Sequence, residues 1–140
     1  MRRFRLSGMI CPVPNLGSFD AVVSRFAIHH LHHRRKRELY AETFRMLRSD
    51  GVFLNLEHVS SATEYLHREF LEKLHTLPED EDPSNKLLPL ETQLTWLREI
   101  GFSHIDCHWK WCELALLERS QALRRGEVRC CCIGRNFPLA

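Results

Sequence analysis

The chain has 140 residues, of which 44% are apolar and 27% are charged, a balance typical of one globular domain. A net charge of +2, with nine histidines counted as neutral, gives no argument for nucleic-acid binding beyond a short basic run at residues 34–37. No run approaches the roughly 18 consecutive apolar residues that a membrane span needs. Arg5 interrupts the apolar stretch after Met1, so no signal peptide is indicated. We expect a cytoplasmic protein that binds neither nucleic acid nor membrane and keeps its six cysteines reduced.

The first part of the chain predicts one strand–helix–strand unit. Residues 1–18 contain Pro and Gly with little periodicity, so we expect an irregular N-terminal arm. Residues 19–27 are almost continuously apolar, as in a parallel strand that helices cover on both faces. Residues 33–48 have helical spacing, and Asp50 and Gly51 are expected to end that helix. A second strand at 51–56 then completes a right-handed crossover unit.

Two more helices are predicted after this unit. Ser61 and Glu64 have the spacing of a capping box, and an apolar stripe continues from there to Pro78. An acidic and polar segment follows and is expected to be a surface loop. The last helix begins at Pro89, which suits a first turn, and ends at Gly101.

The C-terminal part predicts a pair of strands and a tail. Residues 102–111 and 113–117 are expected to form adjacent antiparallel strands. Residues 118–140 are basic, contain CCC at 130–132 and predict a tail, with a short helix over 118–125. The expected organisation is therefore an arm at 1–18, one domain at 19–117 and a tail at 118–140.

Three segments together suggest a family. FDAVVSRFAIHHL is similar to a fourth strand and its following turn, LRSDGVFLNLEHV to a fifth strand, and LREIGFSHIDCHWKWCELALL to a closing helix with the sixth and seventh strands. In this order they resemble the class I S-adenosylmethionine-dependent methyltransferases of the small-molecule type. The resemblance implies an α/β fold, a partial Rossmann-like methyltransferase sheet of family strands 4, 5, 7 and 6 with flanking helices. It also implies methyl transfer from S-adenosylmethionine to a small-molecule acceptor.

The resemblance implies where a site lies. This family binds its cofactor at the carboxyl ends of the parallel strands, which places Ser24, Arg25 and Phe26 beside the methionine part of S-adenosylmethionine.

The acceptor side is implied at the end of the next strand. Glu57 and His58 face the acceptor pocket, with either as a candidate base for a protonated acceptor, and His29 and His30 are candidate substrate-binding residues. The alternative is that Glu57 caps a turn and His58 is solvated.

The segment before Phe19 departs from the family pattern. The six glycines stand at 8, 17, 51, 101, 126 and 134, too far apart for a cofactor loop, and no Asp or Glu precedes Asp20. Eighteen residues are also fewer than the roughly 30 of one strand–helix–strand unit. We therefore expect the first half of the fold to be missing and catalysis to be impaired.

Two other functions remain open. A missing first strand leaves Ala21, Val22 and Val23 on an unpaired edge, so a non-enzymatic remnant that pairs with a protein partner there is one alternative. A zinc-binding module is the second, with clusters at 29–33 and 104–112. Neighbouring residues point apart on a helix or strand, so we expect no metal site.

Overall fold

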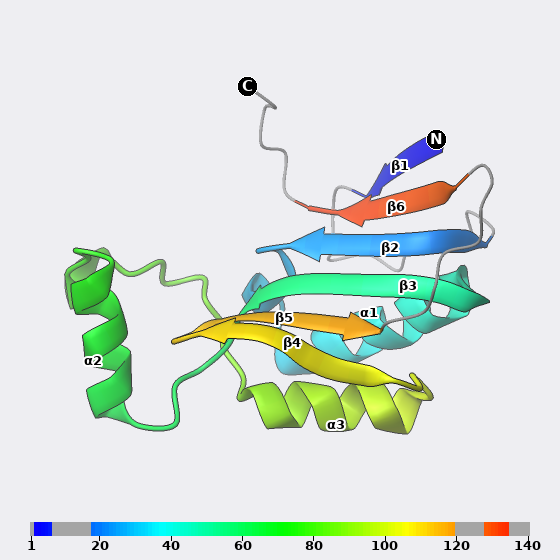
Figure 1. Cartoon of the computed structure of the whole chain (residues 1–140). Coiled ribbons are helices and arrows are strands. Elements are labelled where there is room, and N and C mark those ends of the chain that lie inside the picture. Colours follow the sequence, from blue (N-terminus) through cyan, green and yellow to red (C-terminus); the bar gives the residue numbers. More distant parts are fainter. Residues whose placement is uncertain (1, 7–17, 120–127, 135–140) are drawn as a thin grey trace.

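The structure is a computed structural model, and it describes residues 2–6, 18–119 and 128–134. Its centre is a mixed sheet with strand order β1-β6-β2-β3-β5-β4 (Figure 1). The strands are β1 (Arg2–Leu6), β2 (Phe19–Arg25), β3 (Leu47–His58), β4 (Ile105–Trp111), β5 (Leu114–Arg119) and β6 (Arg129–Ile133). The helices are α1 (His33–Met46), α2 (Glu64–Lys73) and α3 (Leu90–Ile100), with 3-10 turns at η1 (Ile28–His30) and η2 (Pro78–Asp80). None of the described helices is long and apolar enough to cross a membrane.

Four neighbouring strands have the predicted order. β2 and β3 are parallel and joined by α1, with Val22 opposite Phe53. β5 runs antiparallel to β3, and β4 runs antiparallel to β5. The order β2-β3-β5-β4 therefore reproduces the predicted succession 4, 5, 7, 6, and the predicted fold class is confirmed.

The main core lies between the sheet and the helices α1 and α3. Val22, Phe53 and Leu117 point to this face because side chains alternate along a strand. They pack with Leu39 of α1 and Leu97 of α3 in one buried cluster. Burying such apolar side chains contributes about 1.5–3 kcal/mol each. The two helices therefore hold the carboxyl ends of β2 and β3 in a fixed relation.

The C-terminal end of α3 is where the sequence predicted it, whereas the N-terminal cap of α2 is not. Gly101 ends α3 with a φ of 119°, in the left-handed region that favours glycine. At α2 the cap is Thr63, whose side chain accepts the backbone N–H of Leu66 at 3.3 Å. The predicted capping box at Ser61 is therefore wrong by two positions.

β3 is longer than predicted and begins at Leu47. Asp50 and Gly51 do not end α1, because the chain enters the strand before them. The guanidinium of Arg119 donates hydrogen bonds to the carbonyls of Ser49 at 2.5 Å and Gly51 at 3.0 Å, which keeps this segment extended beside β5.

The predicted arm and tail both contain strands. β1 and β6 pair in parallel from Arg2–Arg129 to Leu6–Ile133, so residues 2–6 are not irregular. β6 also pairs in parallel with β2, with Cys130, Cys131 and Cys132 opposite the predicted free edge. Of the predicted helix over 118–125, residues 118 and 119 belong to β5 and the others lie outside the described residues.

The prediction that Ala21, Val22 and Val23 form an unpaired edge is therefore wrong. Cys131 lies opposite Val22 and is fully buried, and Cys130 is buried with Ala21 and Val52. Small apolar thiols fit such positions, since free cysteine behaves as a small hydrophobic residue. The basis for a partner strand at this edge is thereby removed.

Candidate functional site

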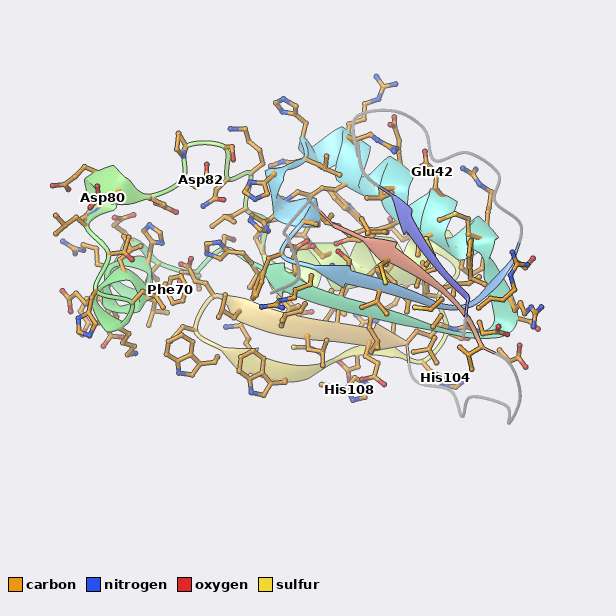
Figure 2. The ribbon with its side chains drawn as sticks, turned by 90° about the horizontal axis from the view of Figure 1, so that it is seen from above. Glu42, Phe70, Asp80, Asp82, His104 and His108 are labelled. Atoms are coloured by element: carbon orange, nitrogen blue, oxygen red, sulfur yellow. The ribbon has the colours of Figure 1, made fainter. Side chains whose placement is uncertain are left out.

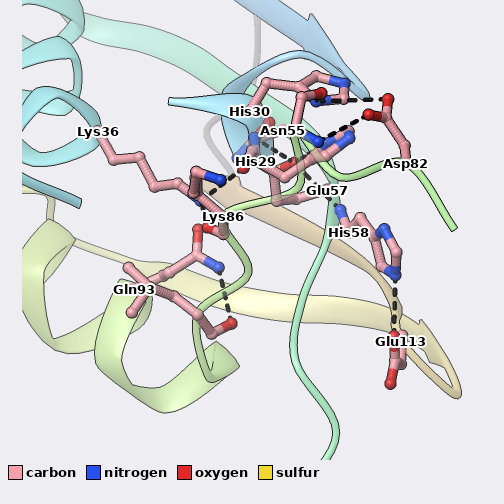
Figure 3. Close-up of polar contacts among 12 residues, drawn as sticks. His29, His30, Lys36, Asn55, Glu57, His58, Asp82, Lys86, Gln93 and Glu113 are labelled. Carbon is pink, nitrogen blue, oxygen red and sulfur yellow. Dashed lines mark hydrogen bonds and ion pairs between the residues drawn. The ribbon is translucent and has the colours of Figure 1, made fainter. Parts of the chain in front are cut away.

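The carboxyl ends of β2 and β3 bring together the residues predicted for the acceptor side (Figure 3). β2 leads into η1, which carries His29 and His30, while β3 ends with Glu57 and His58. The ring centroids of His29 and His30 are 3.9 Å apart, and those of His29 and His58 are 5.5 Å apart. Four residues from two separate segments thus form one polar cluster.

Glu57 joins the two segments through hydrogen bonds. Its side chain is fully buried, and its Oε1 accepts the backbone N–H of His29 and of His58, each at 3.1 Å. The same oxygen lies 2.9 Å from Nδ1 of His29. Glu57 therefore fastens η1 to the end of β3, as the turn-capping alternative expected.

Glu57 also belongs to a buried hydrogen-bond network with Asn55, Tyr40 and Gln93. Asn55 points its Nδ2 toward Oε2 of Glu57 at 3.5 Å and toward the hydroxyl of Tyr40 at 3.3 Å. That hydroxyl donates to Oε1 of Gln93 at 2.6 Å. Burial raises the pKa of Tyr40 well above its usual value, and the charge of Glu57 adds to the effect. The phenol is therefore a donor that stays protonated.

Lys36 of α1 joins η1 to the loop that contains Lys86. Its ammonium donates to the carbonyl of His29 at 3.2 Å and to that of Lys86. Burial lowers the pKa of Lys36 to about 8, although the nearby charge of Glu57 acts in the opposite direction. His30 binds the same loop through its Nδ1, which lies 2.8 Å from the hydroxyl of Ser84.

His58 belongs to a second carboxylate system. Its Nε2 lies 2.9 Å from Oε2 of Glu113, a fully buried carboxylate in the turn between β4 and β5. Nδ1 of His67, on α2, lies 2.9 Å from the other oxygen of Glu113. His58 is therefore not solvated, contrary to the turn-capping alternative, because its side chain is only 14% exposed and is paired.

Glu113 is ionised in this arrangement. Burial acts to raise its pKa, but hydrogen bonds from His58, Ser61 and His67 outweigh burial and lower the value to about 2. An ionised carboxylate only accepts hydrogen bonds, so each imidazole nitrogen facing it carries a proton. Nε2 of His58 is then the donor, and in a neutral imidazole the lone pair lies on Nδ1.

A pocket opens beside Glu113, and His29, His30, Glu57 and His58 are not among its lining residues. It has a volume of about 260 Å³ and is lined by the segment 60–64, His67, Leu87 and Glu113. Hydroxyl, imidazole and carboxylate groups surround a space that suits only a small molecule.

Comparisons with known proteins agree with the fold. Residues 6–55 match the family model described as methyltransferase domain. An O-methyltransferase family protein from Burkholderia thailandensis has 20% identity and a TM-score of 0.55, over 74% of this chain and 30% of that one. The apo form of the S-adenosylmethionine-dependent methyltransferase SibL has 14% identity and a TM-score of 0.58, over 82% and 34% of the two chains. PigF with SAH has 16% identity and a TM-score of 0.52, over 75% and 31%.

The chain has part of the Rossmann-like fold of S-adenosylmethionine-dependent methyltransferases. The resemblance inferred from the sequence is confirmed. The chain spans about a third of the length of the solved structures that it matches. No curated protein matches it.

The predicted cofactor residues lie at the carboxyl end of β2, where a methyltransferase binds the methionine part of its cofactor. Ser24 is buried, and its hydroxyl has no hydrogen-bond partner among the described residues. Phe26 has a φ of 44°. Arg25 is exposed, and its guanidinium lies 6.0 Å from the ring centroid of Phe26. The hydroxyl of Ser24 is therefore a buried polar group at this strand end that a bound ligand could satisfy.

The described residues include no group that is suited to the ribose and adenine parts of the cofactor. β6 occupies the position beside β2, and the single Gly134 follows it in the described part of the chain. No Asp or Glu directly follows β6 or β1 within the described residues, and the glycines are widely separated. The residues described here thus fit only part of S-adenosylmethionine.

The histidine and cysteine clusters do not converge. Among the described residues, no group of three or more His, Cys, Asp and Glu side chains could hold a metal ion. Figure 2 shows His104 and His108 on the β4 side of the sheet, away from α1, which carries His33. The zinc module therefore has no support from the geometry.

Sequence reasoning missed Glu113, His67 and Lys36. Lys36 belongs to a basic run that predicts a solvated helix start, yet it is fully buried. His67 lies on α2, a helix for which the sequence predicted no site residue. The one available signal was Glu113, a carboxylate inside the mostly apolar stretch WKWCELALL.

Proposed function

We propose that this chain provides the acceptor side of an S-adenosylmethionine-dependent methyltransferase that acts on a small protic molecule, such as an alcohol, phenol or amine. One observation carries the proposal: His58 is oriented by the buried Glu113, which lines a pocket of about 260 Å³ just past the carboxyl end of β3. A carboxylate that fixes an imidazole is the usual support of a histidine base.

In this proposal His58 is the general base. Its Nε2–H donates to Glu113, so Nδ1 is the atom that takes the proton of the acceptor. Glu57 acts as a positioning residue, because it is buried and its Oε1 already accepts hydrogen bonds from two backbone N–H groups. His29 and His30 border the acceptor side. S-adenosylmethionine, when bound, supplies a methyl group that is already activated on sulfur.

Cofactor binding by this chain alone is expected to be weak. Ser24 and Phe26 support contacts to the methionine part, whereas the glycine loop and ribose carboxylate are not among the described residues. Calorimetric titration with S-adenosylhomocysteine tests this. A dissociation constant tighter than about 1 mM, which corresponds to roughly −4 kcal/mol, supports methyltransferase function. An absence of binding refutes catalysis by this chain and favours a non-enzymatic role.

A transfer assay tests the base. The chain is incubated with S-adenosylmethionine labelled in its methyl group and a panel of small alcohols, phenols and amines. We expect His58→Gln to lower transfer by roughly 10²–10⁴-fold, the usual contribution of a general base. His108→Gln, at an exposed position on β4, is the matched control and keeps the wild-type rate. Equal rates for the two variants would contradict the assignment of His58.

A further inference from the structure

Helix α2 stands apart from the body of the molecule at one end of the sheet (Figure 1). Phe70 and Leu71 are its buried residues, while Tyr65 and Leu66 are 64% and 44% exposed. Phe70 packs between the rings of His58 and Trp111, at centroid distances of 5.5 Å and 5.9 Å. Figure 2 shows the same separation from above, with Phe70 labelled at α2. Such a helix has few apolar contacts to hold it and opens at a low free-energy cost.

The main polar attachment of α2 is His67. Its Nδ1 lies 2.9 Å from Glu113 in the β4–β5 turn, and its Nε2 lies 3.3 Å from Glu81, which follows η2. His58 of β3 faces the other oxygen of Glu113. One imidazole therefore joins α2 to two other segments through two carboxylates.

We propose that α2 is a lid over the pocket beside Glu113, held closed by protonated His67 between Glu113 and Glu81 and released when His67 loses its proton. The functional meaning of this lid rests on the proposed acceptor pocket, whereas the motion itself does not.

The chemistry of imidazole gives the direction of the effect. Both nitrogens of a protonated imidazole donate, so both carboxylates are satisfied. A neutral imidazole has one N–H, and its lone pair then faces a carboxylate. The hydrogen bond to Glu113 raises the pKa of His67, burial opposes this, and the charges of Glu113 and Glu81 raise it further. The raised value means that the closed lid is most stable at low pH and weakens as pH rises through the pKa of His67.

Release of α2 also changes the surroundings of His58. Phe70 moves away from the His58 ring, and Glu113 keeps a single imidazole partner. His67 itself lines the pocket, together with Thr63 and Glu64 at the start of α2. Opening of the lid would therefore widen the pocket and admit an acceptor to the proposed base.

Hydrogen exchange of the whole chain at several pH values tests the proposal, with protection factors corrected for intrinsic exchange. We expect the protection of the α2 amides to fall by up to about tenfold per pH unit between the pKa values of His67 in the open and closed lid. Amides of α3 serve as the internal reference and should not follow this change. NMR titration of the His67 ring gives the pH window independently.

Three variants complete the test. His67→Gln should lower α2 protection at low pH and remove its pH dependence, and Glu81→Gln should reduce the dependence without removing it. His75→Asn, next to α2 and at a φ of 53° that Asn tolerates, should behave as wild type. Constant α2 protection across the titration of His67, or an unchanged dependence in His67→Gln, would overturn the proposal. A negative transfer assay would refute the proposed function and leave the exchange result unaffected.

Discussion

Replacement of Glu57 separates the contribution of its charge from that of its hydrogen bonds. Two backbone N–H groups and the His29 ring converge on its Oε1, and the side chain is fully buried. A hydrogen bond to a charged group contributes about 1.5–3 kcal/mol, and contributions at one atom are not additive. Each buried donor that loses its acceptor costs about 1–3 kcal/mol, and two backbone N–H groups would lose theirs. We therefore expect Glu57→Ala to lower the free energy of unfolding by about 3–5 kcal/mol.

Glu57→Gln should cost less, about 1–2 kcal/mol, because the amide oxygen still accepts hydrogen bonds from the same groups. Its NH₂ can donate to Oδ1 of Asn55, which has no partner among the described residues. Urea unfolding, with the slope compared among variants, measures both effects. Glu79→Ala, at an exposed position, is the control and should stay within about 0.5 kcal/mol of wild type. A cost below about 1 kcal/mol for Glu57→Ala would show that the two segments do not depend on this carboxylate.

Three further predictions concern stability. Burial lowers the pKa of Lys36 from 10.5 to about 8. The free energy of unfolding of the wild type should therefore rise relative to that of Lys36→Met as pH increases from about 8 to 10.5. Urea titrations in which the two proteins show the same pH dependence would contradict this. Despite burial, hydrogen bonds to His58, Ser61 and His67 lower the pKa of Glu113 from 4.5 to about 2. The stability that Glu113 provides should be complete above pH 4.5 and lost toward pH 2, and Glu113→Gln should lack this acid dependence in circular dichroism. Gly101→Ala should cost about 1–3 kcal/mol in thermal unfolding, since φ is 119° and a Cβ would lie 3.0 Å from Phe44. Gly134→Ala, with no atom of the described residues other than its chain neighbours within 4 Å of the added Cβ, should be neutral, and equal costs would refute the backbone argument.

The sequence was sufficient where local patterns determine structure. Continuous apolar residues predicted β2, and alternation predicted the β4–β5 pair, because burial follows side-chain periodicity. The parallel pairing of β6 with β2 was not predictable. The two strands are far apart in the chain, and three neighbouring cysteines carry no periodic signal.

The same contrast applies to the candidate site. His29 and Glu57 follow neighbouring parallel strands, so topology predicts that they meet. Glu113 and His67 come from a hairpin turn and a separate helix, and only tertiary packing brings them to His58. A residue that joins the site from an antiparallel hairpin is therefore found only when the fold is known.

The bond between Tyr40 and Gln93 has a consequence for the position of α3. Leu94 and Leu97 repeat at a spacing of one helical turn, so sliding the helix along its axis by one turn would still present leucine to the sheet. Hydrophobic packing therefore discriminates poorly between neighbouring alignments of α3. The 2.6 Å hydrogen bond exists in only one of them, and the others would leave the buried Tyr40 hydroxyl without its acceptor and Oε1 of Gln93 without its donor. A polar pair in the core thus selects a single alignment of the helix, and with it a single position for the Asn55 and Glu57 side chains above it.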